Sequence, residues 1–137
     1  MKFSRTVCYA VQAVLLLSES EPGVPVPCRE LAARGAMPER FLLQILRQLV
    51  HRGIVRSTRG TEGGYTLGKP LPSVSLLDVI EAVSGPLEIT VADDTGLPKD
   101  AHARLISALE RVSTNSRRQF ESIKLAQIAL PAAPTEA

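Results

Sequence analysis

The strongest pattern of apolar and polar positions lies between residues 37 and 53. Apolar side chains recur there at intervals of three and four residues, the spacing that gathers side chains on one face of an α-helix. Pro38 suits the first helical position because the N–H that it lacks would have no partner there, and Gly53 is expected to end the helix. The apolar stripe comprises Leu42, Ile45, Leu46 and Leu49. This face is expected to enter a core, which leaves the opposite face free for a partner.

Two short strands are expected directly after this helix, over residues 54–59 and 65–67. The glycine-rich segment 60–64 between them allows a wide turn. Ahead of the helix, residues 24–27 alternate valine and proline, and a residue before proline is pushed away from helical conformations. This extended piece can lie beside the hairpin as a short edge strand.

Two further helices are expected ahead of these elements. Ser4 can cap a first helix, which the Glu-Pro-Gly turn at residues 21–23 ends. Cys8 falls on the apolar side of this helix, so we expect it to be a small core residue. Residues 28–34 predict a short second helix, followed by a turn at residues 35–37. A helix, a short glycine-containing turn and a second helix form the helix-turn-helix unit. With the hairpin, this unit has the layout of a winged helix.

The C-terminal half predicts a helix, a loop and a long amphipathic helix. Ser75 and Asp78 have the spacing of a capping box, and Gly85 is expected to end the helix that follows. Residues 101–121 have helical periodicity with apolar residues at a coiled-coil-like spacing. A long amphipathic helix that the winged helix does not need for its own core more often pairs with a second chain, so we expect this helix to form a dimer. The alternative is that it folds back on the winged helix of its own chain. The expected dimerisation residues are Leu105, Leu109, Val112, Phe120 and Ile123.

Together these elements predict a mostly α fold with a small β-hairpin, a winged helix-turn-helix followed by a long dimerisation helix. The winged helix-turn-helix domain is expected over residues 1–87 and a loop over residues 88–100. The dimerisation helix and a short terminal helix are expected over residues 101–130, and a disordered tail over residues 131–137.

Positive charge is concentrated on the expected winged helix rather than spread along the chain. The formal net charge is only +2, but residues 29–62 hold seven arginines against three glutamates, a local balance of +4. Such a basic patch is the electrostatic footprint of a nucleic-acid-binding domain. Aromatic residues make up 4% of the chain, with no Trp, which disfavours stacking on single-stranded bases. Double-stranded DNA is therefore the expected partner.

The second helix of a helix-turn-helix unit enters the major groove, and residues near its N-terminus reach base edges. There Arg40 can bond guanine, Gln44 can bond adenine, and Leu43 can lie against a thymine methyl group. The alternative is a solvated helix face, but the adjoining turn, hairpin and arginine excess favour DNA. Arg56 and Arg59 would place the wing against the phosphate backbone or a minor groove. The expected DNA-binding residues are Arg29, Pro38, Glu39, Arg40, Leu43, Gln44, Arg47, Arg56, Arg59, Gly60, Gly63 and Gly64.

Five segments of the chain carry a family resemblance. They are Tyr9-Ala10 in the first helix, FLLQIL at residues 41–46, HRGIVRSTRGTEGGYTLGKP at 51–70, SLLDVIEAVSGPL at 75–87, and the SIKLAQI ending. In combination they resemble the IscR- and NsrR-type winged-helix transcriptional regulators of bacteria, the Rrf-two family. The resemblance implies a homodimer on a partly palindromic operator, with a helix of each subunit in a major groove and its wing alongside. It also matches Arg59 and Gln44 to DNA-contacting positions of the family.

The loop ahead of the long helix departs from the family pattern. Cluster-binding members carry three cysteines there, whereas residues 88–105 contain none, and thiolates are the groups that hold an iron–sulfur cluster. The chain's two cysteines, Cys8 and Cys28, do not replace them in position, so we expect no metal site and no iron–sulfur cofactor. His102 and Cys8 remain the open candidates for binding a ligand near this loop.

Composition also limits where in the cell the protein is expected and which class of function it can have. Two cysteines are too few for a disulfide framework, and the longest apolar run, residues 13–17, is far short of a membrane span. We therefore expect a cytoplasmic protein with no membrane partner. Two alternatives stay open: a sensor in which a cluster or small molecule bound by residues 88–102 controls DNA affinity, and a winged-helix module that binds protein. An enzyme is not expected, because the sequence has no nucleophile elbow, HExxH motif or paired-carboxylate arrangement.

Overall fold

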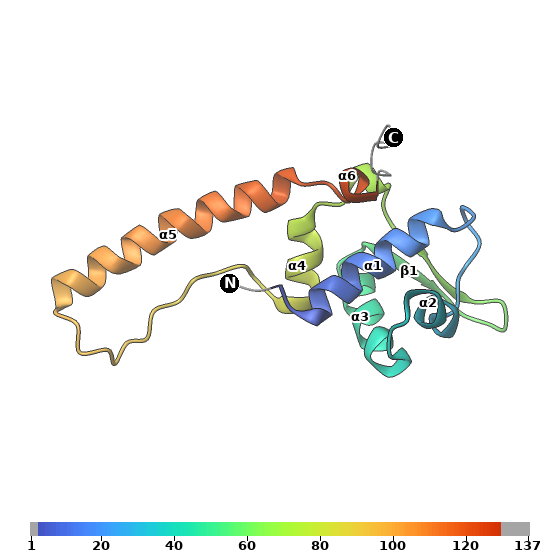
Figure 1. The fold of residues 1–137 in the computed structure, drawn as a ribbon, viewed down its shortest axis with the longest axis horizontal. Coiled ribbons are helices and arrows are strands. Elements are labelled where there is room, and N and C mark those ends of the chain that lie inside the picture. Colours follow the sequence, from blue (N-terminus) through green and yellow to red (C-terminus); the bar gives the residue numbers. More distant parts are fainter. Residues whose placement is uncertain (1–2, 130–137) are drawn as a thin grey trace, which may run out of the picture.

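The computed structural model describes residues 3–129. It consists of a head, formed by packed helices and one β-hairpin, and a long helix that projects from this head (Figure 1). The predicted mostly α fold with a small β-hairpin is confirmed. None of the helices in this described part is long and apolar enough to span a membrane. The expected tail over residues 131–137 lies outside the described residues. The elements are α1 (Arg5–Glu19), α2 (Cys28–Gly35), α3 (Glu39–His51), β1 (Val55–Thr58), β2 (Gly64–Leu67), the 3-10 turn η1 (Leu71–Ser73), α4 (Leu76–Ser84), α5 (Lys99–Ser122) and α6 (Leu125–Ala129).

The core of the head is built around the apolar face of α3, which packs against α1, α2 and α4. All four residues of the predicted stripe on α3 are at most 1% exposed. Ser4 caps α1 as predicted, because its Oγ accepts a hydrogen bond of 3.2 Å from the Val7 N–H. Leu31 of α2 and Val79 of α4 are fully buried against the same core. With one side of α3 fixed in the core, its opposite side must face solvent or a partner.

Strands β1 and β2 with their connection, called the wing below, form an antiparallel hairpin in which Val55 pairs with Leu67. The predicted extended segment lies beside it, but it pairs as an isolated bridge rather than as a strand: Val26 and Tyr65 exchange two backbone hydrogen bonds of 2.9 Å. A Cβ at Gly64 would lie 2.5 Å from the carbonyl group of Val26, so this close approach requires glycine. The wing is thereby anchored to the segment that leads into α2.

Two local predictions are wrong. Cys8 is exposed rather than buried, because the apolar residues of α1 spread over a wider arc than the head covers: Val7 and Ala10 face the core, and Cys8 lies on the adjoining face. Pro38 is the N-cap residue of α3 rather than its first helical residue. Its extended ψ of 124° keeps it outside the helix, while its carbonyl accepts the Leu42 N–H at 2.9 Å.

The chain returns to the head after α5. Helix α4 opens with the predicted capping box between Ser75 and Asp78. The Leu76 N–H then donates to the Ile123 carbonyl at 2.8 Å, and Leu125 of α6 is fully buried in the core of the head. The C-terminal end of α5 is therefore fixed to the head, while its N-terminal end lies far from it (Figure 1).

Helix α5 has no buried residue and does not fold back along the head (Figure 1). The predicted dimerisation residues divide into two groups. Phe120 packs edge-on against Phe3 with ring centroids 5.9 Å apart, and Ile123 bonds to α4, so both contact their own head. Leu105 and Val112 lie on the free part of the helix and are 38% and 49% exposed, and Leu109 between them is half-buried. Within the described residues, the large apolar side chains left exposed on α5 therefore lie on its free part.

Candidate nucleic-acid interface

The turn between α2 and α3 sets the direction of α3. The chain leaves α2 through Ala36, which has the left-handed conformation with φ 52° and ψ 47°. The Met37 N–H donates to the Ala32 carbonyl at 2.9 Å and the Ala36 N–H to the Ala33 carbonyl at 3.4 Å, which is the Schellman pattern of helix ends. Met37 is buried, so α3 starts from an anchored point. The turn of the predicted helix-turn-helix unit is therefore held in one conformation, which fixes the direction of α3 relative to α2.

The side of α3 opposite the core presents polar side chains. Arg40, Gln44 and Arg47, all expected to contact DNA, are exposed, whereas Leu43 is half-buried. Because α3 begins at Glu39, Arg40 lies in its first turn and Gln44 in its second. This is the region of a recognition helix that reaches base edges. An arginine fork and an amide, one turn apart, can bond guanine and adenine edges respectively.

Two residues of this surface are missing from the sequence prediction. Phe41 and Gln48 are exposed on the flank of α3 next to Gln44. The helical period already places both outside the apolar stripe. An aromatic residue outside the stripe is the signal that points to Phe41.

The wing presents two further arginines. Arg56 on β1 and Arg59 directly after it are both exposed, as expected for residues that meet the DNA backbone. A Cβ at Gly60, which has φ +114°, would meet no atom within 4 Å, whereas a Cβ at Gly63 would lie only 2.1 Å from the Thr58 carbonyl oxygen. Gly63 is thus required by the backbone of the wing itself, and Gly60 leaves open space at its tip.

Cys28, the first residue of α2, lies close to the start of α3. Its Sγ–H donates a weak hydrogen bond of 3.7 Å to the Glu39 carbonyl, and Arg29 beside it is exposed. Burial and then the charge of Glu39 raise the pKa of the Cys28 thiol, which favours its neutral form. Burial and then Cys28 raise the pKa of Tyr65 on β2, while Arg47 acts in the opposite direction. The candidate surface therefore consists of α3 and the wing: Cys28 bonds the start of α2 to the start of α3, and Val26 bonds the segment ahead of α2 to the wing.

The segment between α4 and α5 offers no thiolate to a metal cluster. The ring Nε2 of His102, in the first turn of α5, lies 3.3 Å from the carbonyl oxygen of Ala92 in this segment. Across residues 3–129, no three His, Cys, Asp or Glu side chains gather where they could hold a metal ion. The donor groups of this region therefore do not fit a thiolate-bound iron–sulfur cluster.

An anchored helix-turn-helix and a wing with exposed arginines define a winged helix-turn-helix regulator of transcription. Comparison with known protein families indicates the same class of protein. The family model Rrf2, described as "Iron-dependent Transcriptional regulator", matches residues 3–130. The chain therefore belongs to the Rrf2 family, and the resemblance noted in the sequence is confirmed.

Relatives in two bacteria have the same class of name. Rv1287 of Mycobacterium tuberculosis, which is named as an HTH-type transcriptional regulator, is 35% identical over 138 positions, covering 98% of this chain and 84% of that protein. The HTH-type transcriptional regulator IscR of Escherichia coli is 34% identical over 88 positions, covering 64% of this chain and 54% of IscR. The stronger coverage is thus with the mycobacterial protein.

Solved structures share the fold. IscR of T. potens has a TM-score of 0.73 at 26% identity, with 100% of this chain and 94% of that chain covered. CymR, the global cysteine regulator of B. subtilis, has a TM-score of 0.71 at 22% identity, with 94% and 96% covered. The second likeness concerns the fold alone. The relatives and neighbours are regulators of transcription, not enzymes, as the sequence predicts.

Proposed function

We propose that this protein acts in the cytoplasm as a homodimer that binds a partly palindromic site in double-stranded DNA, without an iron–sulfur cluster. The observation that carries the proposal is the exposure of Arg40 and Gln44 on α3 together with Arg56 and Arg59 on the wing. These planar donor groups suit base edges and phosphates. A merely solvated face would require neither the anchored turn ahead of α3 nor the basic wing beside it.

In this proposal, α3 and the wing contact different parts of the DNA. Arg40 and Gln44 lie on the part of α3 that a major groove admits, where their donors distinguish one base from another. Arg56 and Arg59 neutralise phosphates, which positions the protein but carries no sequence information. Arg47, farther along α3, adds positive charge beside the groove.

Two unpartnered apolar surfaces support the homodimer. One is the stripe on the free part of α5 that includes Leu105 and Val112. The other is a groove of about 260 Å³ along α1, lined in part by Phe3, Cys8 and Val11. A second copy of the chain would remove such surfaces from water, which contributes roughly 25 cal/mol per Å² of apolar area. A two-fold symmetric dimer would then bind two half-sites separated by whole turns of DNA.

A symmetric footprint tests the dimer and its DNA site together. The purified protein is footprinted on the DNA upstream of its own gene, and its mass in solution is measured by light scattering. We expect two protected half-sites centred about one helical turn (10–10.5 base pairs) or a multiple apart, and the mass of two chains. A monomer mass with a single asymmetric footprint would contradict the proposal.

The absence of a cluster has its own test. Protein purified under anaerobic conditions is expected to lack visible absorbance and to contain no stoichiometric iron or sulfide, and to bind its DNA in that state. The support is chemical, since the loop ahead of α5 has no thiol and Cys8 and Cys28 lie on α1 and α2. A visible band with matching iron and sulfide would overturn this part of the proposal and leave the DNA site intact.

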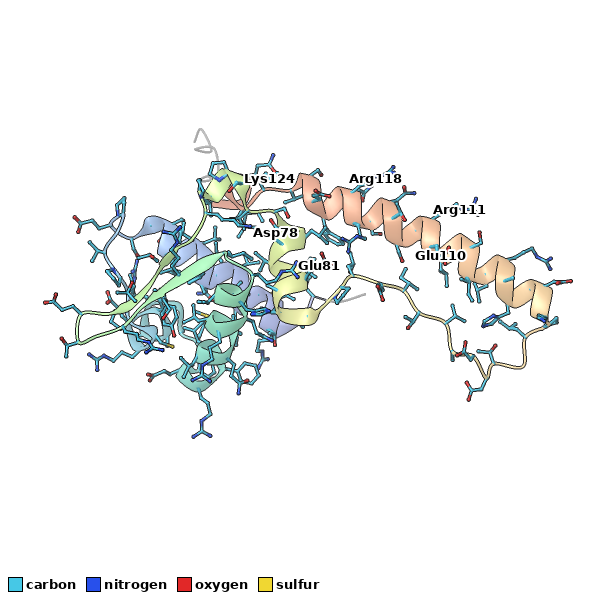
Figure 2. The ribbon with its side chains drawn as sticks, turned by 180° about the vertical axis from the view of Figure 1, so that it is seen from behind. Asp78, Glu81, Glu110, Arg111, Arg118 and Lys124 are labelled. Carbon is cyan, nitrogen blue, oxygen red and sulfur yellow. The ribbon has the colours of Figure 1, made fainter. Side chains whose placement is uncertain are left out.

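A second candidate is a regulator that responds to a small polar molecule. A cavity of about 790 Å³ lies between α4, α5 and residues 86–89, and its lining includes Arg52, Glu81 and Ser113. Figure 2 labels two of its lining residues, Glu81 on α4 and Glu110 on α5. Within the described residues, the Ser113 Oγ is buried without a hydrogen-bond partner. Arg52 is the C-cap residue of α3, so a ligand there would touch the end of the proposed recognition helix. A panel of amino acids and small carboxylates is expected to raise the melting temperature of the wild type but not of Ser113→Val; no rise with any of them would reject this candidate.

A further inference from the structure

Phe41 is the most exposed large apolar side chain on the DNA-facing part of the head. It is 51% exposed although α3 already buries its four stripe residues almost completely. The other two phenylalanines of the chain, Phe3 and Phe120, pack edge-on against each other, although Phe3 is itself 49% exposed. Phe41 is thus an aromatic ring that the core of its own head does not use.

The position of Phe41 on α3 places its ring on the flank next to Gln44, one of the two proposed base contacts. At about 100° per residue, Phe41 lies roughly 60° from Gln44 and roughly 20° from Gln48 around the helix axis. All three are exposed, and they form a row at positions i, i+3 and i+7. Phe41 is also in the first turn of the helix, next to Arg40, where a recognition helix comes closest to base edges.

Leu43, the residue that the sequence suggests for an apolar base contact, is less suited to this role. It is half-buried, and it lies roughly 160° around the helix from Phe41. The two side chains are therefore on opposite flanks of α3, and they would not approach the same base pair.

We propose that Phe41 reads thymine, by packing its ring against the C5 methyl group in the major groove next to the base that Gln44 contacts. The inference rests on the proposed function. Thymine alone among the four bases displays a methyl group in that groove, and phenylalanine is one of the side chains that contact it. The ring has no hydrogen-bonding group, so it leaves the polar edges of the other bases unpaired. It therefore sets a preference for thymine at one position of each half-site.

Replacing thymine with deoxyuracil, which removes only the methyl group, tests the inference. Each thymine of the footprinted site is replaced in turn, and the dissociation constant is measured for the wild type, Phe41→Ala and Leu43→Ala. We expect one position in each half-site at which the wild type and Leu43→Ala lose about fourfold in affinity, the value of one buried methyl-sized group. At that position Phe41→Ala should show no loss on methyl removal.

The outcomes separate this inference from the proposed function. If the wild type prefers no DNA sequence, the proposed function itself fails. If it binds specifically but no methyl effect disappears in Phe41→Ala, or if Leu43→Ala abolishes the effect instead, Phe41 is not the thymine reader. Melting curves of the variants exclude unfolding as the cause, and Phe41→Leu, which keeps an apolar side chain, should retain part of the methyl effect.

Discussion

Arg117 of α5 forms an ion pair with Glu81 of α4 at 2.5 Å, and so connects the long helix to the head. Figure 2 labels Glu81. Glu81 also accepts the Leu87 N–H at 3.0 Å, which ties down the start of the following loop. Burial on its own would raise the pKa of Glu81, but the hydrogen bonds from Arg117 and Leu87 outweigh it and hold this pKa below the ordinary carboxyl value. One carboxylate therefore joins α4, the loop and α5.

The charge of Glu81 is expected to stabilise the fold only where the carboxyl is ionised. Because its pKa is lower in the folded state, its contribution is present above the unfolded-state pKa and is lost as the pH falls through the folded-state pKa. Glu81→Gln should therefore lower the melting temperature at neutral pH, and the difference from wild type should shrink below about pH 4. Glu110→Gln, at an exposed position of α5, is the control and should have little effect. An equal difference at pH 3 and pH 7 would contradict the role of this charge.

Arginines of the wing and polar residues of α3 should respond differently to truncation. Arg59→Ala is expected to weaken binding to specific and random duplexes alike, because phosphate contacts carry no sequence information. Arg40→Ala and Gln44→Ala should instead reduce the preference for the specific site, by about 1–3 kcal/mol for each base contact. Competition binding with matched specific and random duplexes measures both. Equal effects of all three substitutions would show that the assignment of α3 to the major groove is wrong.

A charge on the free stripe of α5 should separate the proposed dimer. Leu105→Glu would bury an unpaired carboxylate in the interface, which costs about 3 kcal/mol or more and raises the dimer dissociation constant more than a hundredfold. Sedimentation equilibrium measures that constant. Ser107→Glu places the same charge at an exposed position two residues along α5 and should leave the dimer unchanged. If both substitutions left the dimer dissociation constant unchanged, the interface would not include the stripe on α5.

The left-handed alanine at the end of α2 predicts a stabilising substitution. For an L-residue other than glycine this conformation costs about 1–2 kcal/mol. Glycine avoids this steric cost but loses more conformational entropy on folding, so the net gain is only part of it. Ala36→Gly should therefore raise the free energy of unfolding by roughly 0.5–1 kcal/mol. Ala33→Gly, inside the same helix, should lower it by about 1 kcal/mol. Urea unfolding of both variants tests the pair; a destabilising Ala36→Gly would show that the turn does not depend on this residue's conformation.

The head could be predicted from sequence because its signals are local and mutually consistent. The stripe on α3, the capping box at Ser75 and the valine–proline segment that pairs through Val26 each act over a few residues, and each is found in the structure. The candidate DNA surface follows from the same periodicity, because the residues opposite a buried stripe must be exposed.

The errors arise where the outcome depends on distant parts of the chain. Cys8 has the periodicity of a core residue, but the number of core-facing positions on α1 is set by the helices that pack on it. Sequence spacing likewise gives no sign that Phe120 contacts Phe3, which lies more than a hundred positions earlier in the chain. Phe41 lies outside the apolar stripe, and its significance becomes visible only once its neighbours on α3 are seen to be exposed.

The salt dependence of DNA binding tests the central claim most directly. The affinity of the purified protein for its upstream DNA is measured over a series of salt concentrations, with random duplex as competitor. Two arginines on the wing of each of two subunits give at least four phosphate contacts, so the slope of log affinity against log salt should be about −3.6 or steeper. Binding should also survive the competitor. A slope near zero, or complete loss of binding to random competitor, would contradict a sequence-specific DNA-binding dimer.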